Sequence, residues 1–221
     1  MNKKQNNEIH HQVERIVREV INALYPDTDV PRIPIGISAR HMHITQEHLE
    51  TLFGPGAQLT KLKDLPQPGE FAANETLTVI GPNRRVFEKV RILGGIRKIT
   101  QLELSYSDGI YLGMKLPHRL SGDIKGSAPF TVVGPQGALH FQEGAIRAMR
   151  HIHMSPEHAG LYSLKQGDHV SVKLSGEMGL TFHNVVVRMG ENLNLYMHVD
   201  TDEANAAGMS SMDAFGILVK E

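Results

Sequence analysis

Residues 40–48 of the chain read RHMHITQEH, and residues 150–158 read RHIHMSPEH. An arginine, two histidines, a hydroxyl residue, a glutamate and a third histidine recur in the same order, so the sequence contains an internal repeat. In both copies two histidines stand two positions apart, and residues two apart on a β-strand project from the same face. Each copy can therefore direct two imidazoles toward one metal ion.

The similarity between the two halves extends weakly beyond these segments. When Phe87 is aligned with Phe182, Glu103 falls opposite His198. Each half would then offer a histidine pair and one further ligand, and catalytic zinc sites commonly combine three protein ligands with an open position. The repeat predicts two such zinc sites, whereas a single His-x-His pair could equally be polar strand surface.

The segments between these motifs are short and rich in Val, Ile, Leu and Thr. Turn signals separate them, among them Gly54-Pro55-Gly56, Gly81-Pro82-Asn83 and Gly134-Pro135-Gln136-Gly137. This pattern predicts a mainly β fold, with two similar small β-barrel domains at residues 33–125 and 126–221 that arose by duplication. Only short helices fit between the strands, at residues 46–53, 156–163 and 202–214.

Residues 1–27 form a separate segment in this interpretation. From Glu8 to Leu24, apolar residues recur at helical spacing, which predicts an amphipathic helix that Pro26 and Asp27 end. Such a helix either docks in the groove of a partner protein or packs against the barrels.

The composition limits the possible classes of protein. The net charge of -1 gives no excess that would favour nucleic acid or an anionic membrane. No stretch approaches the roughly 18 consecutive apolar residues of a membrane span, and no signal peptide is evident, so we expect a cytoplasmic protein. The absence of cysteine excludes disulfides, thiolate nucleophiles and cysteine-ligated zinc.

Other polar residues allow more than one interpretation. His48 and His158 fall in the first turn of predicted helices, which favours a structural role. Arg91 and Arg97 flank two glycines and suit a phosphate, although a solvated strand end explains them as well. Lys63 lies in an insertion that the second half lacks, and such a loop either carries function or decorates the surface.

Taken together, these motifs resemble those of the PduL-type phosphotransacylases, the phosphate propanoyltransferase family, over nearly all of the chain from residue 35. The motifs that carry the resemblance are Ser38-Ala39-Arg40-His41-Met42-His43, Leu62-Lys63-Asp64-Leu65, Val90-Arg91-Ile92-Leu93-Gly94, Arg150-His151-Ile152-His153-Met154 and Met197-His198-Val199-Asp200. The resemblance implies an acyltransferase that interconverts acyl-CoA (propanoyl-CoA) plus phosphate with acyl phosphate plus free CoA. It also implies two zinc ions between two β-barrel domains.

The resemblance further assigns roles to single residues. The metal ligands would be His41, His43, Glu103, His151, His153 and His198. The catalytic residue that handles phosphate would be Arg97, and the CoA and phosphate pocket would include Ser38, Lys63, Arg91, Leu93, Arg97 and Asn205.

The resemblance also bears on partners and location. Members associated with bacterial microcompartments, including those of propanediol degradation, often carry an N-terminal amphipathic helix, so residues 1–27 would bind a shell protein. We also expect a homo-oligomer that binds neither nucleic acid nor membranes.

Two other classes remain open from the residues alone. A dinuclear zinc hydrolase also uses His-x-His, but its familiar barrel version needs about 250 residues of alternating strand and helix. A non-catalytic module stabilised by zinc would normally close each site with four protein ligands, whereas the repeat supplies three.

Overall fold

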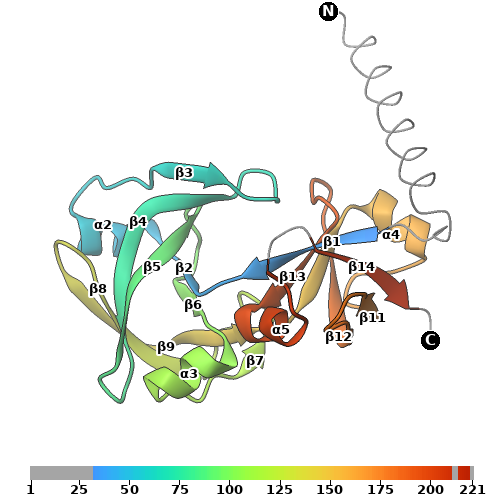
Figure 1. Ribbon diagram of the computed structural model, residues 1–221. Helices are drawn as coiled ribbons and strands as arrows, with labels where there is room; N and C mark the ends of the chain where they lie inside the picture. Colours follow the sequence, from blue (N-terminus) through green and yellow to red (C-terminus); the bar gives the residue numbers. More distant parts are fainter. Residues whose placement is uncertain (1–31, 211–213, 220–221) are drawn as a thin grey trace, which may run out of the picture. The chain divides into compact units, whose positions relative to one another are not determined.

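The computed structural model describes residues 32–210 and 214–219 (Figure 1). The amphipathic helix predicted in residues 1–27 lies outside the described residues. The described part is mainly β, with two small barrels and short helices, so the predicted fold class is confirmed. Among the described residues, no helix has the length and apolar character needed to cross a membrane.

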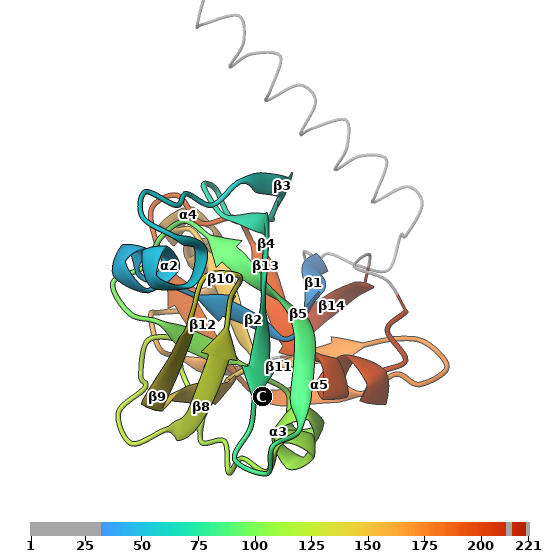
Figure 2. The ribbon, with the colours of Figure 1, turned by 90° about the vertical axis from the view of Figure 1, so that its left-hand side faces the viewer.

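The first barrel is a closed ring of six strands in the order β4-β5-β2-β6-β9-β8. In Figure 2 the molecule is turned so that this barrel faces the viewer. Its strands are β2 (His41–His43), β4 (Phe71–Ile80), β5 (Val86–Gly94), β6 (Gln101–Glu103), β8 (Ala128–Val133) and β9 (Ala138–Ala148). Two further strands pair at its edges, β3 (Lys61–Asp64) with β4 and β7 (His118–Arg119) with β9, and its helices are α2 (Gln46–Phe53) and α3 (Tyr106–Leu112).

The second barrel closes in the order β1-β13-β10-β12-β11-β14. Its strands are β1 (Arg32–Ser38), β10 (His151–Met154), β11 (His169–Leu174), β12 (Thr181–Met189), β13 (Tyr196–Asp200) and β14 (Ala214–Val219), and its helices are α4 (Pro156–Tyr162) and α5 (Thr201–Ala206). The helix predicted at 202–214 is shorter, since among the residues described there only Thr201–Ala206 is helical, and β14 begins at Ala214.

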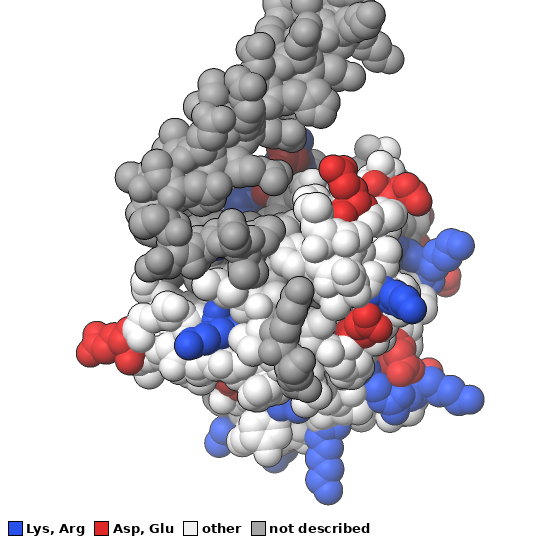
Figure 3. Space-filling model, turned by 90° about the vertical axis from the view of Figure 1, so that its right-hand side faces the viewer, with Lys and Arg blue, Asp and Glu red and all other residues white. Residues whose placement is uncertain are grey.

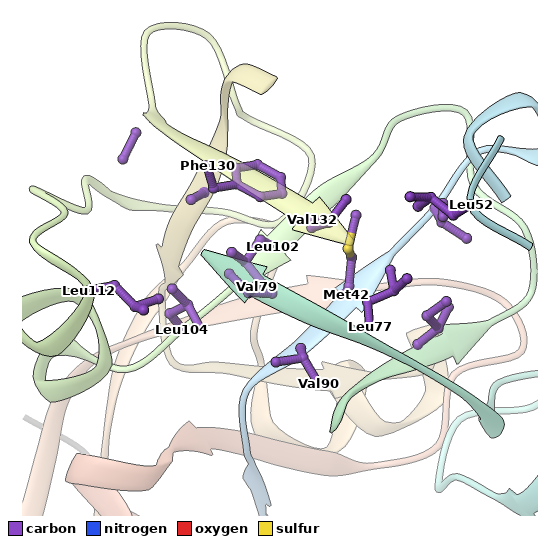
Figure 4. Close-up of a cluster of buried hydrophobic side chains, with 14 of the residues drawn as sticks. Met42, Leu52, Leu77, Val79, Val90, Leu102, Leu104, Leu112, Phe130 and Val132 are labelled. Atoms are coloured by element: carbon purple, nitrogen blue, oxygen red, sulfur yellow. The ribbon is translucent and has the colours of Figure 1, made fainter. Parts of the chain in front are cut away.

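Each barrel is filled by its own apolar cluster. In the first, Met42, Leu77, Leu102 and Phe130 are fully or almost fully buried, and Figure 4 shows such side chains converging from several strands. Because successive residues of a strand face opposite sides, burying Met42 inward turns its neighbours His41 and His43 away from this core. Ile152 does the same between His151 and His153 in the second barrel.

The strand that directly precedes each His-x-His strand belongs to the other barrel, so the two barrels exchange one strand each. Strand β1 directly precedes β2 in the chain but pairs in parallel with β13, and in Figure 1 it lies among the strands of the second barrel. Strand β9 directly precedes β10 but pairs in parallel with β6 of the first barrel. The chain therefore crosses between the barrels twice, at residues 39–40 and 149–150.

This exchange places the barrel limits elsewhere than at 33–125 and 126–221. Strands β8 and β9, at residues 128–148, complete the first barrel, and β1 belongs to the second. The physical reason is that β8 and β9 form a hairpin, in which the Gly134 N–H donates to the Gly137 carbonyl at 2.8 Å, and that this hairpin pairs with β4 and β6. A turn signal near the middle of the chain thus joins two paired strands.

Charged residues of both signs are interspersed on the surface. On the face in Figure 3, described acidic and basic side chains lie side by side over the second barrel. This distribution agrees with the small net charge of the sequence.

The Gly134→Ala variant should lower the free energy of unfolding by about 1–3 kcal/mol, because a methyl group there would overlap its neighbours. A Cβ would lie 2.5 Å from the carbonyl oxygen of Leu52 in α2, and backbone cannot easily move away. Urea unfolding followed by circular dichroism measures the loss.

Gly160→Ala is the matched control, because a Cβ at Gly160 in α4 meets no atom within 4 Å. This variant should be unchanged or gain up to about 1 kcal/mol from the better helix former. Equal unfolding midpoints for both variants would show that the hairpin turn does not pack on α2.

Candidate functional site

Three ligand-type side chains of the first barrel converge at one point. His41 and His43 lie on β2, and His41 stands directly opposite Glu103 of the antiparallel strand β6. The Nε2 atoms of His41 and His43 lie 3.5 and 3.7 Å from the two carboxylate oxygens of Glu103. All three residues are buried. We call this group the first triad.

The second barrel contains an equivalent group, the second triad. His151 and His153 lie on β10, and His151 stands opposite His198 of β13 in the same register. The three ring centroids are 4.7 to 5.1 Å apart. In each triad, one ligand atom from every residue lies within 4.8 Å of the others, which is compact enough for one metal ion.

Backbone contacts fix two of the imidazoles in the same way. Nδ1 of His41 donates to the Ala39 carbonyl at 2.9 Å, and Nδ1 of His151 donates to the Met149 carbonyl at 2.8 Å. A carbonyl oxygen can only accept, so Nδ1 carries the proton and Nε2 keeps a free lone pair. Metal-binding histidines commonly have such a partner for the second ring nitrogen.

Burial keeps four imidazoles neutral, those of His43, His151, His153 and His198. Burial, with a further contribution from a neighbouring histidine, lowers the pKa of His43 to about 3 and that of His153 to about 3. Burial also lowers the pKa of His151 and places that of His198 well below its usual value. A neutral imidazole is the form that binds a metal.

The buried groups fit a cation. Burial alone would raise the pKa of the Glu103 carboxyl, but the adjacent His41 and His43 hold it below its usual value. The first triad therefore buries an ionised carboxylate, a charge that calls for a compensating cation. Moreover, Nδ1 of His153 and Nε2 of His198 are buried without a hydrogen-bond partner in the described part of the chain.

Both triads open into one cavity of about 850 Å³ between the barrels. Five of the residues expected in the CoA and phosphate pocket line it, namely Ser38, Lys63, Arg91, Leu93 and Arg97. The sixth, Asn205, lies exposed on α5 outside this lining. Arg97 is held by an ion pair with Glu70, another lining residue.

The insertion around Lys63 closes one side of this cavity. Gln67 is buried, donates to the Asn194 carbonyl at 3.2 Å and accepts from the Asn194 N–H at 3.0 Å. The Asn194 side chain in turn donates to the Pro66 carbonyl at 2.6 Å. These bonds tie the loop of the first barrel to a loop of the second.

Arg188 is a cavity residue that was not predicted from the sequence. This residue lies on β12 beside His153, lines the cavity, and has its pKa lowered mainly by burial. In the alignment of Phe87 with Phe182, Arg188 takes the position of Leu93. The repeat register could therefore have pointed to Arg188, but an arginine in one half and a leucine in the other do not mark the position as functional.

Comparisons with known proteins agree with one another. A family model described as phosphate propanoyltransferase matches residues 34–210. The chain is 52% identical over 211 residues to a phosphate propanoyltransferase of Lachnoclostridium phytofermentans, covering 94% of this chain and 99% of the relative. It is 45% identical over 201 residues to one from Rhodobacter capsulatus, with 90% and 93% covered, and 46% identical over 203 residues to one from Thermotoga maritima, with 91% and 95% covered.

The metal-free protein should become less stable as the pH falls below about 6.5. The folded pKa of His43 is about 3 and the unfolded value is about 6.5, so the unfolded chain binds more protons between these values. Stability is therefore lost on acidification, by up to about 2 kcal/mol for this group between pH 6.5 and 5. Urea unfolding with a chelator present, repeated at several pH values, measures it.

The His43→Gln variant provides the comparison. It should show a shallower decline of unfolding free energy with acidification than the unaltered protein, because one buried titrating group is gone. Identical slopes would contradict the burial of a neutral imidazole at this position.

Proposed function

The chain belongs to the phosphate propanoyltransferase family, and we propose that it interconverts a short-chain acyl-CoA, preferably propanoyl-CoA, plus phosphate with the acyl phosphate plus free CoA. The observation that carries this proposal is the shared cavity, in which two metal-type triads face the same space as basic side chains. The substrates would bring the thioester carbonyl oxygen, inorganic phosphate and the phosphates of CoA into this cavity, and these groups need cationic partners.

We propose one zinc ion for each triad. His41, His43 and Glu103 would hold the first, and His151, His153 and His198 the second, because three nitrogen or oxygen donors with an open position suit catalytic zinc. When bound, the ions would act as Lewis acids that polarise an oxygen of the thioester or phosphate.

Arg97 and Arg188 would bind the phosphate. A planar guanidinium donates two parallel hydrogen bonds to phosphate oxygens, which orients as well as attracts the anion. Glu70 holds Arg97 at the cavity wall in the free protein. Phosphate would take over part of that hydrogen bonding, so the site exchanges one oxyanion partner for another.

The bound phosphate would attack the thioester carbonyl carbon directly. The new carbon–oxygen bond forms, the carbon–sulfur bond breaks, and CoA leaves as a thiolate. The chain has no cysteine, which suits direct transfer without an acyl-thioester on the enzyme. The CoA pocket would include Ser38, Lys63, Arg91 and Leu93, which line the cavity, and Asn205, which lies outside it.

The remaining partners belong to the same proposal. Residues 1–27 would dock on a microcompartment shell protein, placing a cytoplasmic enzyme inside that compartment, and the protein would form a homo-oligomer.

Arg97→Lys should reduce kcat/KM for phosphate about 10- to 100-fold, since hydrogen bonds to charged groups contribute about 1.5–3 kcal/mol. Lysine keeps the charge but cannot make the paired contacts. The assay follows thiol release from propanoyl-CoA with phosphate varied. Arg119→Lys, which alters an exposed ion pair with Asp123, serves as the control and should retain normal kinetics.

Thiol release without added phosphate, at an equal rate, would identify a hydrolase and overturn the proposed transfer. Normal phosphate kinetics in Arg97→Lys would remove Arg97 from the phosphate site while leaving the reaction class intact.

Removal of residues 1–27 should leave kcat and KM nearly unchanged, because every proposed ligand lies in or beyond β1. The same residues fused to a fluorescent protein should concentrate it in cells that assemble shells. Diffuse fluorescence, together with a less stable truncated enzyme, would instead show that the segment packs on the enzyme itself.

A further inference from the structure

The first residue of each repeated motif, Arg40 or Arg150, has no role in the proposed reaction. Each arginine lies on one of the two-residue crossovers between the barrels, immediately before the first histidine of a triad. Both arginines contact the same kinds of partner. One is an aromatic ring on a strand that neighbours the His-x-His strand, and the other is a carboxylate on the helix that follows the second neighbouring strand.

Arg40 makes close contacts on both sides. Its Nη2 donates to Asp108 Oδ1 at 2.6 Å, and its Nε lies 3.2 Å from both carboxylate oxygens. The guanidinium carbon lies 4.1 Å from the ring centroid of Phe87 on β5. In the sheet, β2 lies between β5 and β6, so this side chain connects the central strand to elements on each flank.

The carboxylate of Asp108 also caps helix α3. It accepts from the backbone N–H of Ser105 at 3.3 Å while its own N–H donates to the Ser105 hydroxyl at 3.2 Å, a capping box at the start of α3. Ser105 comes two residues after Glu103. Asp108 thus fixes the chain just beyond the third ligand, and Arg40 fixes Asp108 to the chain just before the first.

The second barrel repeats this arrangement at equivalent positions. Arg150 Nη1 lies 3.4 Å from Glu203 Oε1, and its guanidinium carbon lies 5.5 Å from the centroid of Phe182 on β12. Glu203 forms a capping box with Asp200, which comes two residues after His198. Each triad is therefore accompanied by the same arrangement, an arginine that contacts the carboxylate of a helix-capping residue.

We infer that Arg40 and Arg150 are positioning residues, each of which fixes the His-x-His strand relative to the strand of the third ligand so that three donor atoms meet at one metal ion. This inference rests on the proposed zinc sites.

Strand length explains why such a tie is needed. Strands β2 and β6 have three residues each, so few ladder hydrogen bonds fix their register, whereas β10 and β13 have four and five. The tighter arginine–carboxylate contact occurs at the shorter strands. We therefore expect the first triad to depend on its arginine more than the second does.

The test measures zinc affinity by chelator competition in full-length protein, with each site isolated. His153→Ala removes the second triad and His43→Ala the first. In the His153→Ala background, Arg40→Met should weaken zinc binding about tenfold or more, as is typical for partners that orient metal ligands, while Arg150→Met changes nothing. In the His43→Ala background, Arg150→Met should weaken binding, by a smaller factor, and Arg40→Met should not.

Two further variants separate positioning from general stability. Asp108→Asn keeps a capping side chain but loses the ion pair, and should weaken the first site alone. Arg119→Met removes a remote ion pair and should leave both affinities unchanged. Thermal unfolding of the metal-free variants identifies any that fail to fold.

The possible outcomes are distinct. Lower unfolding temperatures with unchanged zinc affinities, or equal weakening of both sites by either arginine variant, would overturn the inference while leaving the proposed zinc sites intact. An unaltered protein that binds no zinc would overturn the proposed sites, and the inference with them.

Discussion

The register of two antiparallel strand pairs is the constraint on which the rest of the structure depends. His41 stands opposite Glu103, and His151 stands opposite His198. A slip of one residue in either pair would turn every side chain of that strand to the other face, burying the ligand-type residues in a barrel core and exposing Met42 or Ile152. The packing of the two cores and the assembly of the two triads therefore impose the same register.

The exchange of β1 and β9 explains why both triads face one space. Each crossover leads the chain out of one barrel and directly into the His-x-His strand of the other, so each strand begins at the boundary between barrels. The cavity there takes its lining from both barrels, and the bonds between Gln67 and Asn194 hold its loops together. Neither barrel alone would enclose it.

Features set by residues close together in sequence could be predicted, whereas features set by contacts between distant segments could not. The His-x-His pairs and their third partners follow from a two-residue period and a repeat, both visible along the chain, and the structure brings all six side chains together as two triads. The exchange was not predicted because the pairing of β1 with β13, and of β9 with β6, depends on contacts far apart in sequence. Arg188 was missed because Leu93 occupies its place in the first half.

The difference between the triads has an electrostatic consequence. Only the first contains a carboxylate, Glu103, while the second consists of neutral imidazoles, so a divalent ion in each would leave more positive charge in the second barrel than in the first. Arg188 lies beside His153 and adds to this positive side, whereas Arg97 is balanced by Glu70. Of the two proposed metal sites, the second would thus present the larger positive charge to an anion in the cavity. The duplication supplied two equal frameworks, and a single change of ligand, glutamate against histidine, makes them electrostatically unequal halves of one site.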